Sequence, residues 1–209
     1  MAGLHLSEDE QSERIKAWWK ENGTSVIAGT VLGIAVIVGV NYWRSYQAEQ
    51  AETAAELYQE LMNGQAESAA GAGRTLIDEY AGTPYAGKAA LLLAAMAVDD
   101  GDLEGAAEHL DWAMSEAADP ADRKVARLRA ARVALSRDDP DAAANLLSAM
   151  QAGGYESEYR ELLGDIAMAR GETTVARREY ESALAALPQQ SGYSTLLNAK
   201  LDAATGASQ

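Results

Sequence analysis

The chain has 209 residues, which is enough for one domain of ordinary size and a membrane anchor. Its formal net charge of −15 repels phosphate backbones and argues against DNA or RNA as a partner, while the absence of cysteine excludes disulfides, thiolate metal sites and cysteine nucleophiles. Alanine, leucine and glutamate are the most frequent residues and, like arginine, favour helix over strand, so we expect an all-α fold.

Residues 1–22 predict a short amphipathic helix at the cytoplasmic face of a membrane. Ile15, Trp18 and Trp19 share one side of this helix, as expected for a segment that lies at a lipid–water interface. Asn22-Gly23 is a pair that commonly ends a helix, so we expect a break before the apolar stretch that follows. The alternative is that the segment only sets the topology of that stretch.

Residues 23–43 predict a transmembrane helix. The sequence from Val26 to Val40 carries no charge, and 21 residues lie between Asn22 and Arg44. At about 1.5 Å per residue they cover roughly 30 Å, the thickness of a hydrocarbon core. A buried core helix would not explain this length, and the lack of an A-x-A site after the stretch argues against a cleaved signal peptide.

Aromatic residues flank this helix on both sides. Trp18 and Trp19 precede it, and Tyr42 and Trp43 stand at its end. Aromatic belts of this kind mark the two membrane–water interfaces, because the rings are amphipathic. We therefore predict that these four side chains anchor the span at its two interfaces.

The basic residues around the span predict its direction. Arg14, Lys16 and Lys20 precede it, whereas Arg44 alone follows it within the next twenty residues. Cytoplasmic flanks carry the excess of lysine and arginine. The N-terminus is therefore expected in the cytoplasm and the long C-terminal part outside it.

Gly29 and Gly33 form a G-x-x-x-G pair within the span. Small residues at this spacing let two membrane helices approach closely, so the pair is a candidate packing face for another membrane helix. The alternative is that spanning helices simply tolerate glycine.

Residues 44–209 predict a domain of helical repeats. Helical patterns continue from Arg44 to about Met62, then over Ala66–Tyr80 and Pro84–Asp99. Beyond them, three stretches share one helix–turn–helix outline. Their equivalent alanines, which lie 37 and 33 residues apart, are Ala106, Ala143 and Ala176. A period near 34 residues is the tetratricopeptide signature, so we predict a tetratricopeptide-like α-solenoid after the single spanning helix.

The repeats also predict which residues form the core. Small residues such as Gly164 are expected where two helices of a pair cross, while Leu110, Leu147 and Tyr180 fill the gap to the next repeat. These side chains are expected to pack together rather than to bind a ligand. The second repeat lacks the turn glycine of the other two.

Residues suited to catalysis are scarce. The only histidines are His5 and His109, and no serine has a nearby histidine base with which to form a triad. The acidic turns at Asp99–Asp102 and Asp138–Asp141 are expected to cap helices rather than to bind calcium. We therefore expect a protein that is not an enzyme and has no cofactor.

The stretch ENGTSVIAGTVLGIAVIVGVNYWRSYQ, with the acidic-then-basic helix that ends at Trp18-Trp19, resembles the N-terminus of the YfgM family. The tetratricopeptide-like remainder is similar to the rest of that family, so the resemblance covers nearly the whole chain. Members of the family are ancillary subunits of the SecYEG translocon. The resemblance implies a bacterial inner-membrane protein whose C-terminal domain lies in the periplasm.

The resemblance also implies partners and a role. The implied partners are SecYEG, the membrane-anchored periplasmic chaperone PpiD and newly translocated client proteins, which would be handed to periplasmic chaperones. On the cytoplasmic side the family is linked to restraint of the response regulator RcsB. The alternative is another envelope-assembly scaffold built from the same repeats, because a fold does not decide a function.

A partner groove is expected on the first helix of each repeat, which lines the concave face in tetratricopeptide stacks. The groove is predicted to have a basic end, an acidic end and exposed apolar footholds at Leu128 and Met168. The residues matched to this face are Lys88, Leu91, Leu128, Arg132, Glu158, Glu161, Asp165 and Met168. The alternative is that these residues are ordinarily solvated, and that partners bind a loop or the helix next to the membrane.

Overall fold

The computed structural model describes residues 8–148, 150–188 and 191–206 of the chain. It divides the chain into two compact units, Met1–Ala51 and Glu52–Gln209. The described residues form helices joined by short turns and contain no β-strand. The predicted all-α class is therefore confirmed.

The first helix, α1, runs without a break over Glu8–Asn63, so the helix end predicted at Asn22-Gly23 is wrong. The side-chain nitrogen of Asn22 donates to the carbonyl of Trp18 at 3.1 Å. Gly23 lies under the indole of Trp19, where a Cβ would stand 3.2 Å from the ring. Glycine inside a helix costs only about 1 kcal/mol relative to alanine, and a helix of 56 residues tolerates this cost at one position.

Among the described residues, α1 is the helix that is long and apolar enough to cross a membrane. Its large apolar side chains between Val26 and Val40 are 38% to 69% exposed. A helix that is apolar on every side and uncovered by protein suits a lipid environment rather than water. The long apolar N-terminal helix expected from the sequence is thus present.

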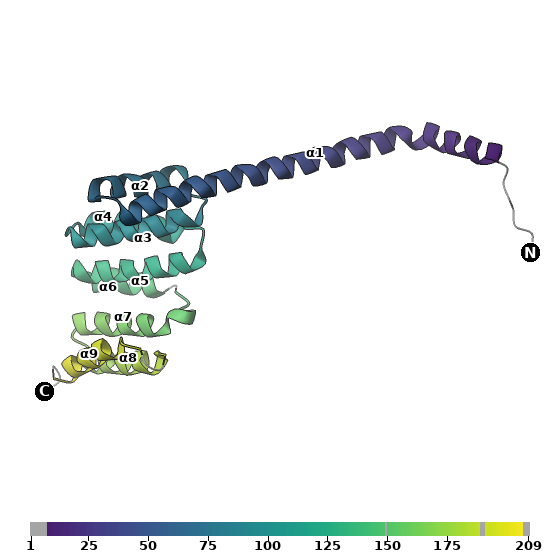
Figure 1. Cartoon of the computed structure of the whole chain (residues 1–209). Helices are drawn as coiled ribbons and strands as arrows, with labels where there is room; N and C mark the ends of the chain where they lie inside the picture. Colours follow the sequence, from purple (N-terminus) through teal and green to yellow (C-terminus); the bar gives the residue numbers. More distant parts are fainter. Residues whose placement is uncertain (1–7, 149, 189–190, 207–209) are drawn as a thin grey trace, which may run out of the picture. The chain divides into compact units, whose positions relative to one another are not determined.

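The helices of Glu52–Gln209 follow one another as a stack of antiparallel hairpins (Figure 1). Their bounds are Ala66–Glu79 for α2, Pro84–Asp99 for α3, Leu103–Glu116 for α4, Pro120–Ser136 for α5, Pro140–Ser148 for α6, Glu156–Ala169 for α7, Thr173–Ala186 for α8 and Ser194–Gly206 for α9. The short 3-10 turn η1, Gly153–Tyr155, precedes α7. The predicted helices Ala66–Tyr80 and Pro84–Asp99 agree with α2 and α3 to within one residue.

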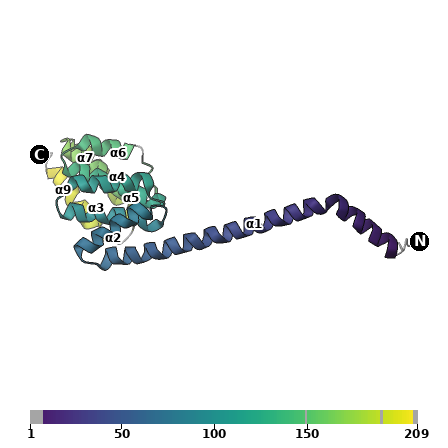
Figure 2. The ribbon, with the colours of Figure 1, turned by 90° about the horizontal axis from the view of Figure 1, so that it is seen from above.

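Each helix in the stack packs against the next one, and α5 also contacts both α3 and α7 directly. We call these three helices the first-helix layer, because each is the first member of its hairpin. In the view along the stack, the hairpins overlap within one body (Figure 2). The last part of α1 belongs to this body, since Ala54 and Leu61 are buried against α2 and α3.

The turns between the paired helices share one conformation. Gly101 and Gly171 adopt φ values of +81° and +75°, and the equivalent residue of the middle repeat, Asp138, adopts +58°. Aspartate is one of the few residues that enter this left-handed region without a large penalty. The repeat that lacks the turn glycine therefore keeps the turn.

The acidic turns cap helices, as predicted. The carboxylate of Asp102 accepts the backbone N–H of Gly105 at 2.9 Å, and that of Asp139 accepts the N–H of Ala142 at 2.9 Å. Each bond satisfies one of the free N–H groups at a helix start. This is the role expected from sequence.

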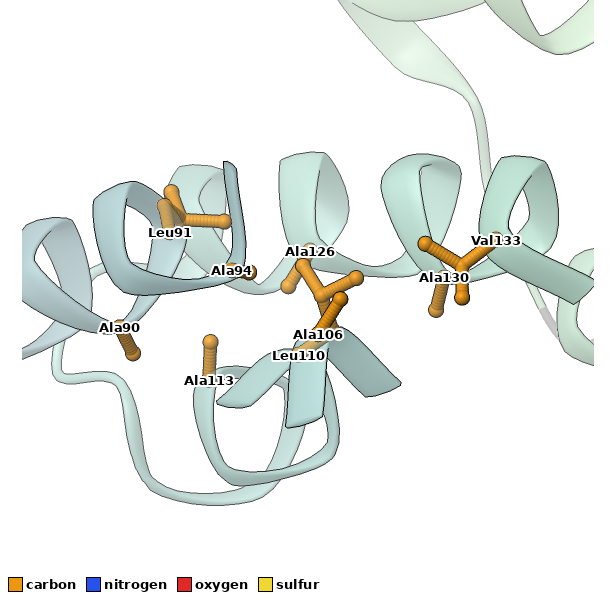
Figure 3. Close-up of a cluster of buried hydrophobic side chains, with 9 residues drawn as sticks. All are labelled: Ala90, Leu91, Ala94, Ala106, Leu110, Ala113, Ala126, Ala130 and Val133. Carbon is orange, nitrogen blue, oxygen red and sulfur yellow. The ribbon is translucent and has the colours of Figure 1, made fainter. Parts of the chain in front are cut away.

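Side chains at equivalent positions of the three repeats form the core of the stack, as predicted. Figure 3 shows the cluster in which Leu91 of α3, Leu110 of α4 and Val133 of α5 meet around small alanines. The three repeat alanines have no exposed surface and are Ala106, Ala143 and Ala176. At Gly164 an added Cβ would overlap the ring of Tyr180, which explains why that crossing needs glycine.

Candidate functional site

The four predicted belt residues lie on α1 with their side chains exposed. Trp18 and Trp19 are 53% and 52% exposed and lie next to each other, with ring centres 6.5 Å apart. Tyr42 and Trp43 are 75% and 60% exposed. Aromatic rings uncovered by protein at both ends of an apolar helix are available to the two membrane interfaces.

Gly29 and Gly33 lie one turn apart on α1, and a Cβ built on either would meet nothing within 4 Å. Between them, the hydroxyl of Thr30 donates to the carbonyl of Val26 at 2.8 Å, which satisfies the O–H donor of this side chain. The two glycines thus offer an uncovered backbone surface of the kind on which a second membrane helix packs.

In the repeat domain, the predicted groove residues form ion pairs between successive hairpins. The ammonium of Lys88 on α3 lies 3.1 Å from the carboxylate of Asp122 on α5. On the same two helices, Arg129 donates to the backbone carbonyl of Leu91 at 3.0 Å. These contacts join the first-helix layer along the stack.

Glu161 on α7 is the centre of a polar cluster that joins several helices. Glu161 is only 2% exposed. Its carboxylate accepts hydrogen bonds from the guanidinium of Arg132 on α5 at 3.0 Å, the ammonium of Lys200 on α9 at 2.6 Å and the hydroxyl of Tyr193. Burial opposes the charge of Glu161, but the hydrogen bonds from Lys200 and Tyr193 and the nearby cations outweigh it and hold its pKa below the ordinary value. Burial and the bond to Glu161 raise the pKa of Tyr193 to about 12.

Asp165 extends this cluster by one turn of α7. Its carboxylate accepts the ammonium of Lys200 at 2.6 Å and the hydroxyl of Tyr180 at 2.8 Å. Burial and the neighbouring carboxylate raise the pKa of Tyr180, so this phenol stays protonated and donating. The cluster ties α5, α7, α8 and α9 together.

The structure corrects part of the predicted groove. Leu128 is 3% exposed and Leu91 is 8% exposed, so both are core residues, and Leu128 is not an exposed foothold. Met168 is partly buried against the last core cluster. Of the predicted acidic end, Glu161 is buried and Glu158 is partly exposed. Here the charges of Lys88, Arg132 and Asp165 already pair with neighbouring helices, which leaves fewer of them for a partner.

The residues that complete these ion pairs were not identified from the sequence. Asp122 lies 34 residues after Lys88, and Lys200 lies 35 residues after Asp165. These separations are close to one repeat period, so opposite charges one repeat apart were the available signal. Tyr193 precedes α9 and follows no repeat position, and no pattern in the sequence marks it.

Known protein families and curated proteins match the chain over most of its length. A family model described as a tetratricopeptide repeat-like domain covers residues 16–206. Proteins named ancillary SecYEG translocon subunit match as well. The one from Haemophilus influenzae is 30% identical over 190 residues, which covers 90% of this chain and 91% of the relative.

Two further relatives carry the same name. The protein of Escherichia coli K12 is 29% identical over 182 residues, covering 86% of this chain and 88% of its own. The protein of Neisseria gonorrhoeae is 27% identical over 203 residues, covering 95% and 97%. No solved structure matches the chain.

Proposed function

Because this chain belongs to the YfgM family of ancillary SecYEG translocon subunits with a tetratricopeptide repeat-like domain, we propose that it is a membrane-anchored adaptor at the Sec translocon, which helps pass newly translocated proteins to periplasmic chaperones. The observation that carries the proposal is the extent of the match, since the relatives align over anchor and repeats together. Repeat stacks of this kind present surfaces for other proteins. The proposed role is binding, without a catalytic step of its own.

The proposal includes an orientation in the inner membrane. Arg14, Lys16 and Lys20 precede the apolar stretch, against Arg44 after it, which favours a cytoplasmic N-terminus and a periplasmic repeat domain. A phosphatase reporter fused after Gln209 is expected to be active in the periplasm. A reporter at that position which is active only in the cytoplasm would overturn this orientation.

The proposed partners divide between the two sides of the membrane. In the periplasm they are a PpiD-like chaperone and translocated clients, held by the first-helix layer, where Lys88, Arg132 and Glu158 keep partly exposed charges. In the membrane the partner is SecYEG, with Gly29 and Gly33 as the packing face. On the cytoplasmic side, residues 1–22 would meet an RcsB-like response regulator.

Co-purification after gentle detergent extraction tests the adaptor function. Translocon subunits and a periplasmic chaperone are expected with the wild-type protein. Recovery of cell-wall or cytochrome assembly proteins in their place would favour a different envelope scaffold.

The membrane partner can be separated from the periplasmic ones with two variants. Replacing both Gly29 and Gly33 with leucine should lower recovery of SecYEG, because bulky side chains keep two helices apart. The matched control replaces Thr24 and Ala28 with leucine, because these two residues are also exposed on α1 near the glycines. An equal loss of SecYEG recovery in both double variants would rule out Gly29 and Gly33 as the packing face.

A further inference from the structure

Two hollows lie next to each other on the first-helix layer, in the C-terminal halves of α3, α5 and α7. The first has a volume of about 240 Å³ and the second about 430 Å³. They share Arg132 and Ser136 of α5, so the surface is continuous from one hollow to the other. An extended chain that enters the first hollow can therefore leave through the second.

The first hollow is mainly apolar. Its walls come from α3, α4 and α5, and the residues that matter here are Ala94, Val98, Leu103, Leu110, Arg129 and Val133. Leu110 and Val133 belong to the buried cluster of Figure 3, whereas Val98 is 42% exposed at the opening. The volume suits one aliphatic side chain and is too small for a whole helix or a drug-sized ligand.

The first hollow also carries a cation with unused donors. The guanidinium of Arg129 has five N–H groups and gives one bond, to the carbonyl of Leu91. Within the described ranges, no carboxylate lies within 4.0 Å of it, whereas Arg132 on the next turn is already paired with Glu161. In a chain with a net charge of −15, an exposed unpaired arginine beside an apolar hollow favours an anionic ligand.

We propose that these hollows bind an internal segment of a partner protein in which an aliphatic side chain stands next to one carboxylate side chain. The aliphatic group would fill the first hollow, the carboxylate would pair with Arg129, and the chain would continue over Arg132 into the second hollow. Asp99 also lines the first hollow and repels a second carboxylate, so strongly acidic segments are disfavoured. The inference deepens the proposed function and rests on it for the identity of the partner as a protein.

Photo-crosslinking to the full-length protein in lipid nanodiscs tests this site. The probe is a biotinylated peptide with photo-leucine, glutamate and leucine in a glycine–serine background. Crosslinks are expected at Val98 and Leu103, and Arg129→Gln should lower their yield about fivefold, the effect of one charge contact. Arg127→Gln is the matched control, because Arg127 lies on the same helix but lines a different hollow, between α4 and α6.

Two further arms keep the test decisive. Replacing the glutamate of the peptide with glutamine should lower the crosslinking yield of the wild-type protein by the same factor. With the Arg129→Gln variant, this change in the peptide should lower the yield no further. Val98→Glu should also lower crosslinking at Leu103, because its carboxylate would occupy Arg129 and repel that of the peptide, and helical content by circular dichroism should be unchanged in every variant. Crosslinks spread over the surface, equal yields in both arginine variants, or no crosslinking at millimolar peptide would overturn the site.

These outcomes are separate from those of the proposed function. Peptide binding with no recovery of SecYEG would keep the site and remove the translocon assignment. Recovery of SecYEG with no peptide binding would do the reverse.

Discussion

Replacing Lys200 by methionine should loosen α9 from the stack. The ammonium of Lys200 lies 2.6 Å from both Glu161 and Asp165, and Glu161 is 2% exposed. Breaking a buried ion pair costs about 3–5 kcal/mol, because the remaining charge stays buried. Lys200 itself is 26% exposed and Glu161 keeps Arg132, so we expect a loss of about 2 kcal/mol.

Urea unfolding of residues 44–209, followed by circular dichroism, measures this loss. With a denaturant slope of about 2 kcal/mol per molar, the midpoint should fall by about 1 M. Lys124→Met is the matched control, because no carboxylate of the described residues lies within 4.0 Å of the Lys124 ammonium, and its midpoint should move by less than about 0.25 M. Equal midpoints for the two variants would refute the assignment of Lys200 as a structural contact.

The same cluster predicts how stability depends on pH. The pKa of Glu161 is lower in the folded protein than its ordinary value of 4.5, so the charged form stabilises the fold. This contribution is complete above about pH 4.5 and is lost as the pH falls through the lower folded-state pKa. The difference in unfolding free energy between the wild type and Glu161→Gln should therefore be largest near neutral pH and shrink below pH 4.5. A difference that stays constant down to pH 3 would contradict this account.

Three more outcomes are expected. Removal of residues 1–43 should leave a soluble helical domain that no longer sediments with membranes, and a fragment without helical signal would count against an independent repeat core. Gly164→Ala should lose about 1–3 kcal/mol because its methyl group would overlap Tyr180, whereas Gly71→Ala, with open space around it, should be neutral or stabilising by up to about 1 kcal/mol. Asp138→Gly should raise the urea midpoint slightly, since glycine adopts a positive φ at no steric cost, and a lowered midpoint would show that the aspartate side chain contributes more than its backbone strain costs.

The sequence by itself determined the features that depend on local pattern. A long uncharged apolar stretch predicts a spanning helix because lipid requires both its length and its composition. A period near 34 residues predicts stacked hairpins, and the buried positions of Ala106, Ala143 and Ala176 follow directly from that period. The turn at Asp138 keeps the left-handed conformation of the two glycine turns, because aspartate enters that region without a large penalty.

Only the tertiary structure decided which charges are free for a partner. Lys88, Arg132 and Glu161 occupy the helix positions that the repeat outline predicts, but each is paired with a residue 29 to 34 positions away. Such a pairing depends on the distance between neighbouring helices and on the side-chain rotamers there, neither of which a periodic pattern specifies. Arg129 was not among the predicted groove residues, because only the packing of α3 against α5 shows that an arginine next to an apolar hollow has no carboxylate partner in the described structure.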